Sequence, residues 1–182
     1  FNNAGVLLDQ LYFSDYGNEL QLEINAISPY LLTQALIPIL EQSESAFVVS
    51  TTTGSMERRK SLDITAFKKP SKFTKLTGSY MDSKITLIAL MNHLADQHKN
   101  IRFAHVNPGA IKTKMTAGSG MPLLLKPIRN LLFKSPEVGA QNLYKGAFDK
   151  NFQESGIYIS ENKIKAIKAK ISVEEINQLL AV

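Results

Sequence analysis

The chain has 182 residues, of which 44% are hydrophobic and 20% charged, as is typical of one globular domain with a buried core. Cysteine is absent, which excludes disulfides, thiol nucleophiles and zinc–thiolate sites. The formal net charge of +5 is dispersed, except in MERRK (56–60) and FKKPSKFTK (67–75). We interpret both stretches as solvated loops. The alternative is an acidic partner or nucleic acid, but no aromatic platform or known module supports it, so we expect no nucleic-acid partner.

The sequence shows neither a targeting signal nor a membrane-spanning segment. No apolar run approaches the roughly 20 residues that span a bilayer, and no secretory signal precedes FNNAGVLL, so we expect a cytoplasmic protein. Phe1, followed at once by turn residues, is typical of the last step of a strand. We therefore expect this chain to be a piece of a longer protein.

The first half of the chain alternates between helical and strand patterns. After the NNAG turn, apolar residues spaced three and four apart predict a long helix over 18–42. SAFVVSTTTG (45–54) predicts a buried strand that ends in small hydroxyl residues. Residues 55–77 are polar and irregular, which predicts a long loop near a working site.

The second half continues this alternation. Residues 79–98 predict an amphipathic helix, and IRFAHVNPG (101–109) predicts a strand closed by Pro-Gly. A helix is expected over 135–149, with proline at its first position, and a short strand over 155–160. The segment 172–182 predicts a helix that begins with a Ser-x-x-Glu capping box.

This order of elements predicts a parallel sheet covered by helices, in which ligands bind at the carboxyl ends of the strands. The motifs NNAG, STTTG and NPGAIKT each directly follow a predicted strand. Because parallel strands end at one edge of a sheet, we expect these three motifs to lie together.

Five motifs together carry a resemblance to a known family. NNAG, a helix bearing IN, a strand ending in STTTG, YMDSK and NPGAIKT occur in the order and spacing of the short-chain dehydrogenases/reductases. SPEVGAQ followed by SGIYIS further resembles retinol-dehydrogenase-like and protochlorophyllide-reductase-like members. The resemblance implies an α/β Rossmann-type fold, a doubly wound parallel sheet, over a single partial domain (1–182), with NAD or NADP as cofactor.

The family's N-terminal strands and glycine-rich phosphate loop precede NNAG, and they are absent from this chain. The residue that would choose between NAD and NADP is absent with them. A polypeptide of only these residues is expected to lack the adenine half of the cofactor site and to expose a sheet edge. We expect that it would neither bind cofactor tightly nor turn over substrate alone.

Tyr80 and Lys84 lie four residues apart, on one face of a predicted helix. Transfer of a hydride from an alcohol requires a general base for the hydroxyl proton, and an ammonium nearby favours the phenolate and lowers its pKa. The resemblance implies that Tyr80 is the acid/base and that Lys84 also holds the nicotinamide ribose. The alternative is a tyrosine packed on the core beside a lysine that reaches solvent.

Asn25 matches the asparagine with which the family holds a relay water. Pro29, four residues later, has no N–H and cannot donate to the carbonyl of Asn25, which leaves that carbonyl free for water if the stretch is helical. A proline kink that serves packing is the alternative. The family's hydroxyl donor falls on Thr51 where serine is usual, and Ser50 could serve if the register slips by one.

The resemblance also implies cofactor contacts at two turns. The backbone of Asn3, Ala4 and Gly5 would lie against the cofactor. Pro108 and Gly109 would close the second turn, with Ile111 at the carboxamide and Thr113 near the pyrophosphate. In each case a simple turn or strand end is the alternative. No metal site is expected, because His93 and His98 diverge around a helix.

Residues 114–134 match the family's flap over the substrate. Gly118 and Gly120 could hinge it, and its leucines would form an apolar wall. We predict a lid or core helix here, with contact to a membrane surface as the alternative. The expected substrate is a small apolar alcohol or carbonyl, and the two long helices around Asn25 and Tyr80 form the homodimer or tetramer face in many relatives. The function expected is a nicotinamide-dependent oxidoreductase, and the alternative is a non-catalytic remnant that binds a dinucleotide or a protein.

Overall fold

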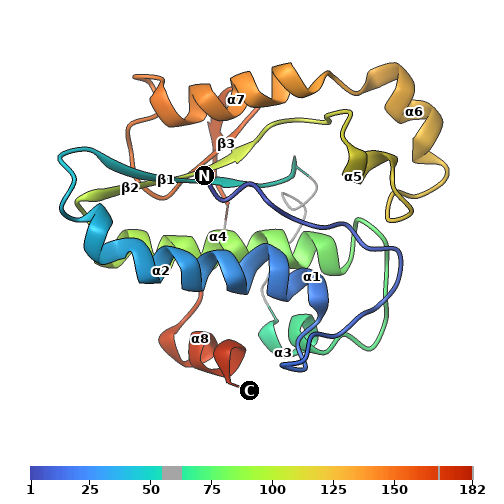
Figure 1. Ribbon diagram of the computed structural model, residues 1–182, viewed down its shortest axis with the longest axis horizontal. Helices are drawn as coiled ribbons and strands as arrows, with labels where there is room; N and C mark the ends of the chain where they lie inside the picture. Colours follow the sequence, from blue (N-terminus) through green and yellow to red (C-terminus); the bar gives the residue numbers. More distant parts are fainter. Residues whose placement is uncertain (55–62, 168, 182) are drawn as a thin grey trace.

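The computed structural model describes residues 1–54, 63–167 and 169–181 (Figure 1). The basic stretch 56–60 lies outside these residues, so its predicted character is not tested. The second basic stretch begins inside a short helix, α3 (Ile64–Lys68). The prediction of a loop over 55–77 is therefore wrong at α3, because the polar composition of this stretch gave no sign of a short helix.

The centre of the fold is a four-stranded sheet in the order β1-β2-β3-β4. Strands β1 (Ala46–Thr51), β2 (Ile101–Asn107) and β3 (Ile157–Ser160) are parallel, as the sequence predicts. The antiparallel β4 (Lys163–Lys165) was not predicted. It has only three residues, and its hairpin turn uses Glu161 and Asn162 at positive φ instead of the usual Asn-Gly pair.

The start of the chain lies beside β1. The N–H of Asn2 donates to the Val49 carbonyl (2.8 Å), and the Asn2 carbonyl accepts from the N–H of Thr51 (2.9 Å), in a parallel bridge. The strand end predicted here is thus confirmed. In the part of the chain that the structure describes, no other strand pairs with this outer edge of β1, as expected for an open sheet edge.

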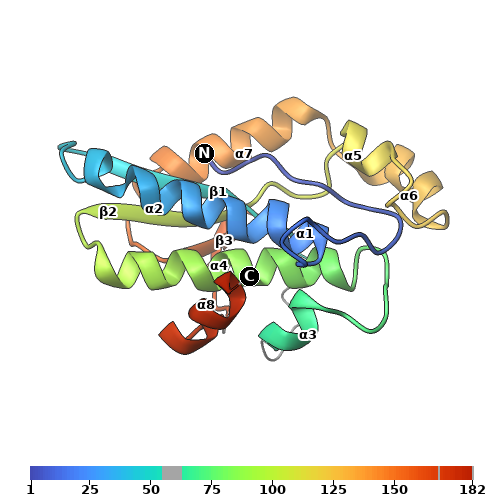
Figure 2. The same cartoon turned by 60° about the horizontal axis from the view of Figure 1, so that its bottom comes forward.

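Helices cover both faces of the sheet (Figures 1 and 2). On one face lies α7 (Pro136–Phe148), and on the other lie α2 (Ser28–Leu40) and α4 (Ser79–Gln97). The helix predicted over 18–42 is confirmed as a continuous run: α1 (Leu20–Leu22), a π-helical turn η1 (Glu23–Ile27), and α2.

The π-turn has a local cause. Pro29 has no N–H with which to continue the normal ladder, and the N–H of Ser28 donates five residues back to the Glu23 carbonyl. This wide turn contains Asn25. π-Helical turns inside helices occur frequently at functional sites, which agrees with the position of this residue.

Helix α4 is the centre of the hydrophobic core. The sequence predicts an amphipathic helix here, yet residues 79–91 are buried on every side. The reason is that α3 and α8 (Val173–Leu180) cover the side of α4 that faces away from the sheet (Figures 1 and 2). A helix apolar or buried all round is a core helix. The capping box predicted at Ser172 and Glu175 is confirmed at the start of α8.

This covering affects the dimer face that the resemblance implies. Helix α2 keeps exposed aliphatic side chains at Leu31, Leu32, Leu36 and Ile39. Helix α4 offers no comparable surface, since its outer side packs against α3 and α8 of the same chain. Among the described residues, only one of the two implied helices is therefore available to a partner.

Candidate active site

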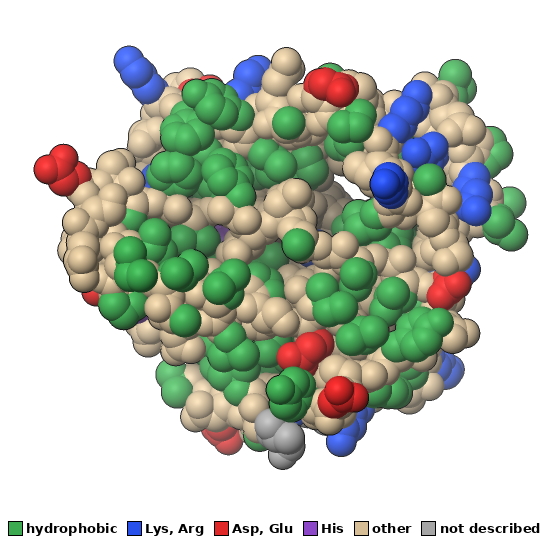
Figure 3. All heavy atoms as spheres, in the orientation of Figure 1, with side chains coloured by type: hydrophobic (Ala, Val, Ile, Leu, Met, Phe, Trp, Pro, Cys, Tyr) green, Lys and Arg blue, Asp and Glu red, His purple; other side chains and the backbone are tan. Residues whose placement is uncertain are grey.

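A cavity of about 760 Å³ opens at the carboxyl ends of the parallel strands. Its lining comes mainly from the NNAG turn, the ends of β1 and β2, the start of α4, the segment 114–134 and α7. Figure 3 shows the surface hollowed beside the short helices α5 (Lys114–Ala117) and α6 (Leu125–Leu132). The predicted gathering of the three strand-end motifs is confirmed.

Most of the residues predicted for the site line this cavity. They are Asn3, Ala4, Gly5, Thr51, Tyr80, Pro108, Gly109, Ile111 and Thr113. The two that do not are Asn25 and Lys84, which lie behind the lining. The prediction that the motif residues after the strands line one cavity is thus confirmed, because the strand ends fix where these residues lie.

Tyr80 lies in the first turn of α4, where only 6% of it is exposed. Burial raises the pKa of Tyr80 to about 12. The sequence predicts that Lys84 lowers this pKa, and this prediction is wrong. Desolvation of the phenolate is the dominant effect, because α4 is buried on all sides.

Lys84 follows one turn later and is 3% exposed, so the alternative of a lysine reaching solvent is also wrong. Its Nζ donates to the main-chain oxygen of Thr51 (3.1 Å), which joins α4 to the end of β1. Burial lowers the pKa of the Lys84 ammonium to about 8. The ammonium therefore lies directly behind the cavity wall that Thr51 and Tyr80 form.

Asn25 connects the NNAG segment to α4. Its Nδ2 donates to the Val6 carbonyl (3.0 Å) and to Ser83 Oγ (3.0 Å), while its Oδ1 accepts from the N–H of Val6 (2.8 Å). The side chain is thus fully engaged within the protein. A relay water would have to be held by the Asn25 main-chain carbonyl, to which Pro29 cannot donate.

Gly5 is required by this packing. A Cβ at Gly5 would lie 2.9 Å from Asn25 Oδ1 and 3.4 Å from Lys84 Nζ. Both groups can approach the first turn only because glycine has no side chain. The role that the sequence assigns to Gly5, close approach of the backbone, is therefore seen toward Asn25 and Lys84.

Ser50 and Thr51 differ in the face of the sheet on which they lie. Ser50 pairs with His105, whose Nε2 lies 2.9 Å from Asn92 Oδ1 on α4, so Ser50 is buried beneath that helix. Thr51 follows on the other side of the pleat, lines the cavity, and donates its hydroxyl to Asn3 Oδ1 (2.8 Å). The geometry puts Thr51 in the cavity and keeps Ser50 out of it.

The sequence predicts only some of the apolar residues that line the cavity. Met115, Met121, Leu125 and Phe133 come from the predicted flap. Two further leucines of the lining had no signal in the sequence: Leu76 and Leu143. One lies in an irregular segment and one on a helix whose neighbours only the fold reveals.

The flap is tied to the body at several points. Arg129 donates from Nε to Thr116 Oγ1 (3.1 Å) and from Nη2 to the Thr113 carbonyl (3.3 Å), which fixes α6 on α5. Gly120 does not act as the hinge that the sequence suggests: a Cβ there would lie 2.2 Å from the Leu7 carbonyl oxygen. Gly120 is instead a point of close backbone contact.

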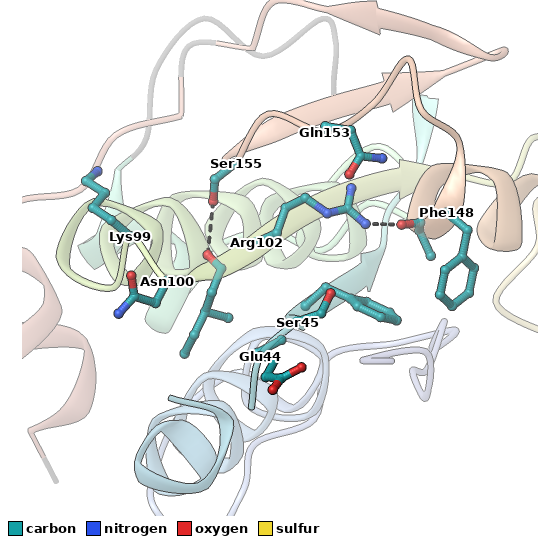
Figure 4. A pocket seen from close by; sticks show the side chains of 12 residues that line it. Glu44, Ser45, Lys99, Asn100, Arg102, Phe148, Gln153 and Ser155 are labelled. Carbon is teal, nitrogen blue, oxygen red and sulfur yellow. Dashed lines mark hydrogen bonds between the residues drawn. The ribbon is translucent and has the colours of Figure 1, made fainter. Parts of the chain in front are cut away.

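A second cavity of about 490 Å³ lies at the amino ends of the strands (Figure 4). Arg102 extends into it, but its guanidinium donates to the main-chain carbonyls of Phe152 (2.5 Å) and Ala147. These bonds hold the end of α7 against β2. The cationic group is thus engaged by backbone, and we assign the functional site to the first cavity.

Comparisons with known proteins bear on the family and the fold of the chain. No protein-family model matches the chain. It is 25% identical over 186 residues to retinol dehydrogenase 14 from Homo sapiens, covering 98% of this chain and 55% of that protein. It is 29% identical over 114 residues to dehydrogenase/reductase SDR family member 12 from Bos taurus, covering 62% of this chain and 35% of that protein. The chain spans about half the length of the retinol dehydrogenases it matches.

Two solved structures give the same result for the fold. A short-chain dehydrogenase from Shigella flexneri, complexed with NADP, superposes with a TM-score of 0.61 at 25% identity, over 87% of this chain and 60% of that one. The NADPH-bound carbonyl reductase from chicken fatty liver gives a TM-score of 0.64 at 19% identity, over 91% and 64%. The second of these speaks for the fold alone.

Proposed function

The chain is a member of the short-chain dehydrogenase/reductase family, and from this premise we propose that the native protein is an NAD(P)-dependent oxidoreductase that interconverts a carbonyl and an alcohol on an apolar substrate. One observation carries the proposal. Tyr80 and Thr51, from separate elements, line one apolar-walled cavity with the ammonium of Lys84 directly behind it.

Three residues at the cavity would each have a separate role in the reaction. Burial keeps Tyr80 protonated at physiological pH, so it is ready to donate its proton to the oxygen of a carbonyl as that oxygen gains charge. Lys84 would stabilise the phenolate that remains. Thr51 would donate a hydrogen bond to the same substrate oxygen. In the reverse reaction the same groups would take the proton back from the alcohol.

The strand-end turns support a nicotinamide group near Tyr80. Gly109, at φ +92°, has nothing within 4 Å of where a Cβ would be, so the main chain there is open to the cavity. Asn3, Ala4 and Gly5 also line the cavity, and Ala4 and Gly5 are small. When bound, the nicotinamide would supply or accept the hydride. The backbone of Ile111 would hold the carboxamide and Thr113 would lie near the pyrophosphate, with NAD and NADP both to be tested.

The apolar lining supports the choice of substrate. Methionine, leucine and phenylalanine side chains from the flap line the same cavity as Thr51 and Tyr80. A site of this kind binds a hydrophobic body and fixes one polar end. We therefore assign an aldehyde or ketone with an apolar body as the substrate class.

Turnover by the native protein tests this function. Oxidation of NADH and of NADPH is followed with a panel of apolar aldehydes and ketones. Tyr80→Phe should lower kcat by about 10²–10⁴-fold, because the general acid is lost. Tyr30→Phe is the matched control, since Tyr30 is also buried but does not line the cavity.

Two results would contradict the proposal. Equal turnover by Tyr80→Phe and the unmodified protein would remove Tyr80 from the chemistry. A folded native protein that binds cofactor without turning over any member of the panel would be a non-catalytic dinucleotide-binding relative.

A further inference from the structure

Helix α6 and the two residues before it present an apolar surface to solvent. Leu124 is 87% exposed and Leu131 is 82% exposed, values unusual for leucine in a folded domain. The surface, here called the α6 patch, comprises Leu123, Leu124, Ile128, Leu131 and Leu132. Residues 124, 128, 131 and 132 are spaced three and four apart, so they form one continuous stripe along the helix.

The opposite side of α6 already has its partners. Leu125 lines the cavity, and Arg129 bonds to Thr113 and Thr116 on the neighbouring segment. None of the residues of α6 is buried. The prediction of a core helix is thus wrong, whereas its role as one wall of the cavity is supported. The outward stripe is left without a packing partner in the part of the chain that the structure describes.

The sequence around α6 carries charges of one sign. From Gln97 to Pro136 the sequence contains no aspartate or glutamate. Within the part of this segment that surrounds α6, residues 112–134, the cations are Lys112, Lys114, Lys126, Arg129 and Lys134. Figure 3 shows blue and green side chains side by side at this corner of the molecule. An apolar stripe edged by lysines is the pattern of a helix that lies on an anionic lipid surface.

We infer that the α6 patch docks the protein on an anionic membrane surface, with the helix lying in the plane of the interface. A helix of eight residues is only about 12 Å long, against roughly 30 Å of hydrocarbon, so it cannot cross the bilayer. None of the described helices has the length and apolar composition to span a membrane. The inference concerns binding and goes beyond the proposed reaction.

A second copy of this chain is a poorer occupant of the α6 patch. In a two-fold dimer the same surface meets itself, so the cations of residues 112–134 would face one another. Like charges across an interface are costly, and lysine is depleted in the cores of protein interfaces. An anionic membrane, in contrast, complements both features: its headgroups complement the cations, and its acyl chains complement the apolar stripe.

Docking through the α6 patch would place the cavity beside the bilayer. Leu125 and Phe133, which line the cavity, adjoin the patch in sequence. An apolar substrate dissolved in the membrane would then reach the cavity along an apolar path. Docking would thus account for the exposed leucines, whose contact with water is unfavourable.

Co-sedimentation with vesicles tests the inference. The native protein is mixed with vesicles of phosphatidylcholine and phosphatidylserine, and with vesicles of phosphatidylcholine alone. Binding is expected to the anionic vesicles and to fall with added salt. The double variant Leu124→Ser/Leu131→Ser should lower the partition coefficient at least about tenfold. Lys126→Gln should lower it about fivefold.

Matched controls lie on the far side of the fold. Leu32→Ser/Ile39→Ser removes two exposed aliphatic side chains from α2, and Lys150→Gln removes an exposed cation after α7. Both should bind like the unmodified protein. Circular dichroism of every variant checks that the fold is kept.

Three outcomes would overturn the inference. One is no binding to the anionic vesicles, and another is unchanged binding by Leu124→Ser/Leu131→Ser. The third is a dimer in solution that this double variant dissociates, without any vesicle binding, since a second copy would then cover the patch. Because the assay measures binding and not turnover, its result is independent of the proposed reaction.

Discussion

At the scale of single residues, Lys84 links the site to stability. Burial lowers the pKa of its ammonium from 10.5 to about 8. Between these pH values the unfolded chain binds more protons than the native state, so the contribution of Lys84 to the free energy of unfolding rises with pH through this window. Below pH 8 the buried charge costs the native state about 3 kcal/mol.

We therefore expect the difference in unfolding free energy between the unmodified protein and Lys84→Met to change by about this amount from pH 7 to pH 10.5. Urea unfolding at several pH values measures it. Lys150→Met, at an exposed position, is the control and should show no such change relative to the unmodified protein. A pH-independent difference for Lys84→Met would mean that Lys84 is solvated in the native state.

At the scale of elements, the position of the flap depends on close backbone contact at Gly120. A Cβ there would lie 2.2 Å from the Leu7 carbonyl oxygen and 2.8 Å from that of Leu8. Because both are backbone atoms, neither can move aside without shifting its segment. Gly120→Ala should therefore lower the free energy of unfolding by about 1–3 kcal/mol and raise KM as the cavity wall is displaced.

Gly118→Ala is the matched control in the same flap. A Cβ there meets its nearest atom, the Met115 carbonyl oxygen, at 3.3 Å, which a shift of a few tenths of an ångström relieves. Its cost should stay below about 1 kcal/mol. Urea unfolding and steady-state kinetics compare the two variants, and equal effects would argue against a clamp at Gly120.

At the scale of the whole molecule, the C-terminal helix completes the core. Leu179 on α8 is fully buried, at 0% exposed, and belongs to one hydrophobic cluster with Ile85 and Ile88 of α4. Lys68 of α3 donates to the Gln178 carbonyl (3.0 Å), which joins the two covering helices. Leu179→Ala should cost about 2–5 kcal/mol of unfolding free energy, since it leaves a cavity beside α4.

Val173→Ala, in the exposed first turn of α8, is the control and should change stability by less than about 0.5 kcal/mol. Urea unfolding again gives both values. A small effect of Leu179→Ala would mean that α8 is not part of the cooperative core, and α4 would then be open to a partner helix.

The sequence by itself determined the elements and the places where chemistry gathers. Hydrophobic spacing identified the three parallel strands and the long helices, and the order of strands and helices placed NNAG, STTTG and NPGAIKT at one edge of the sheet. Capping at Ser172 and the effect of Pro29 on the helix ladder were also readable, because each depends on residues no more than five positions away. The resemblance to the short-chain dehydrogenases/reductases was readable for the same reason, since each motif is local.

Only the tertiary structure decided what surrounds each of those residues. The pKa of Tyr80 rises instead of falling because the folded chain leaves only 6% of this residue exposed. Helices α3 and α8 likewise bury α4 from a side that the sequence left open. Thr51 and Ser50 are separated by the face of the sheet on which each lies, and α6 exposes the leucines that its pattern suggested would be covered. Burial, desolvation and exposure are properties of contacts between segments far apart in the chain, and no local pattern contains them.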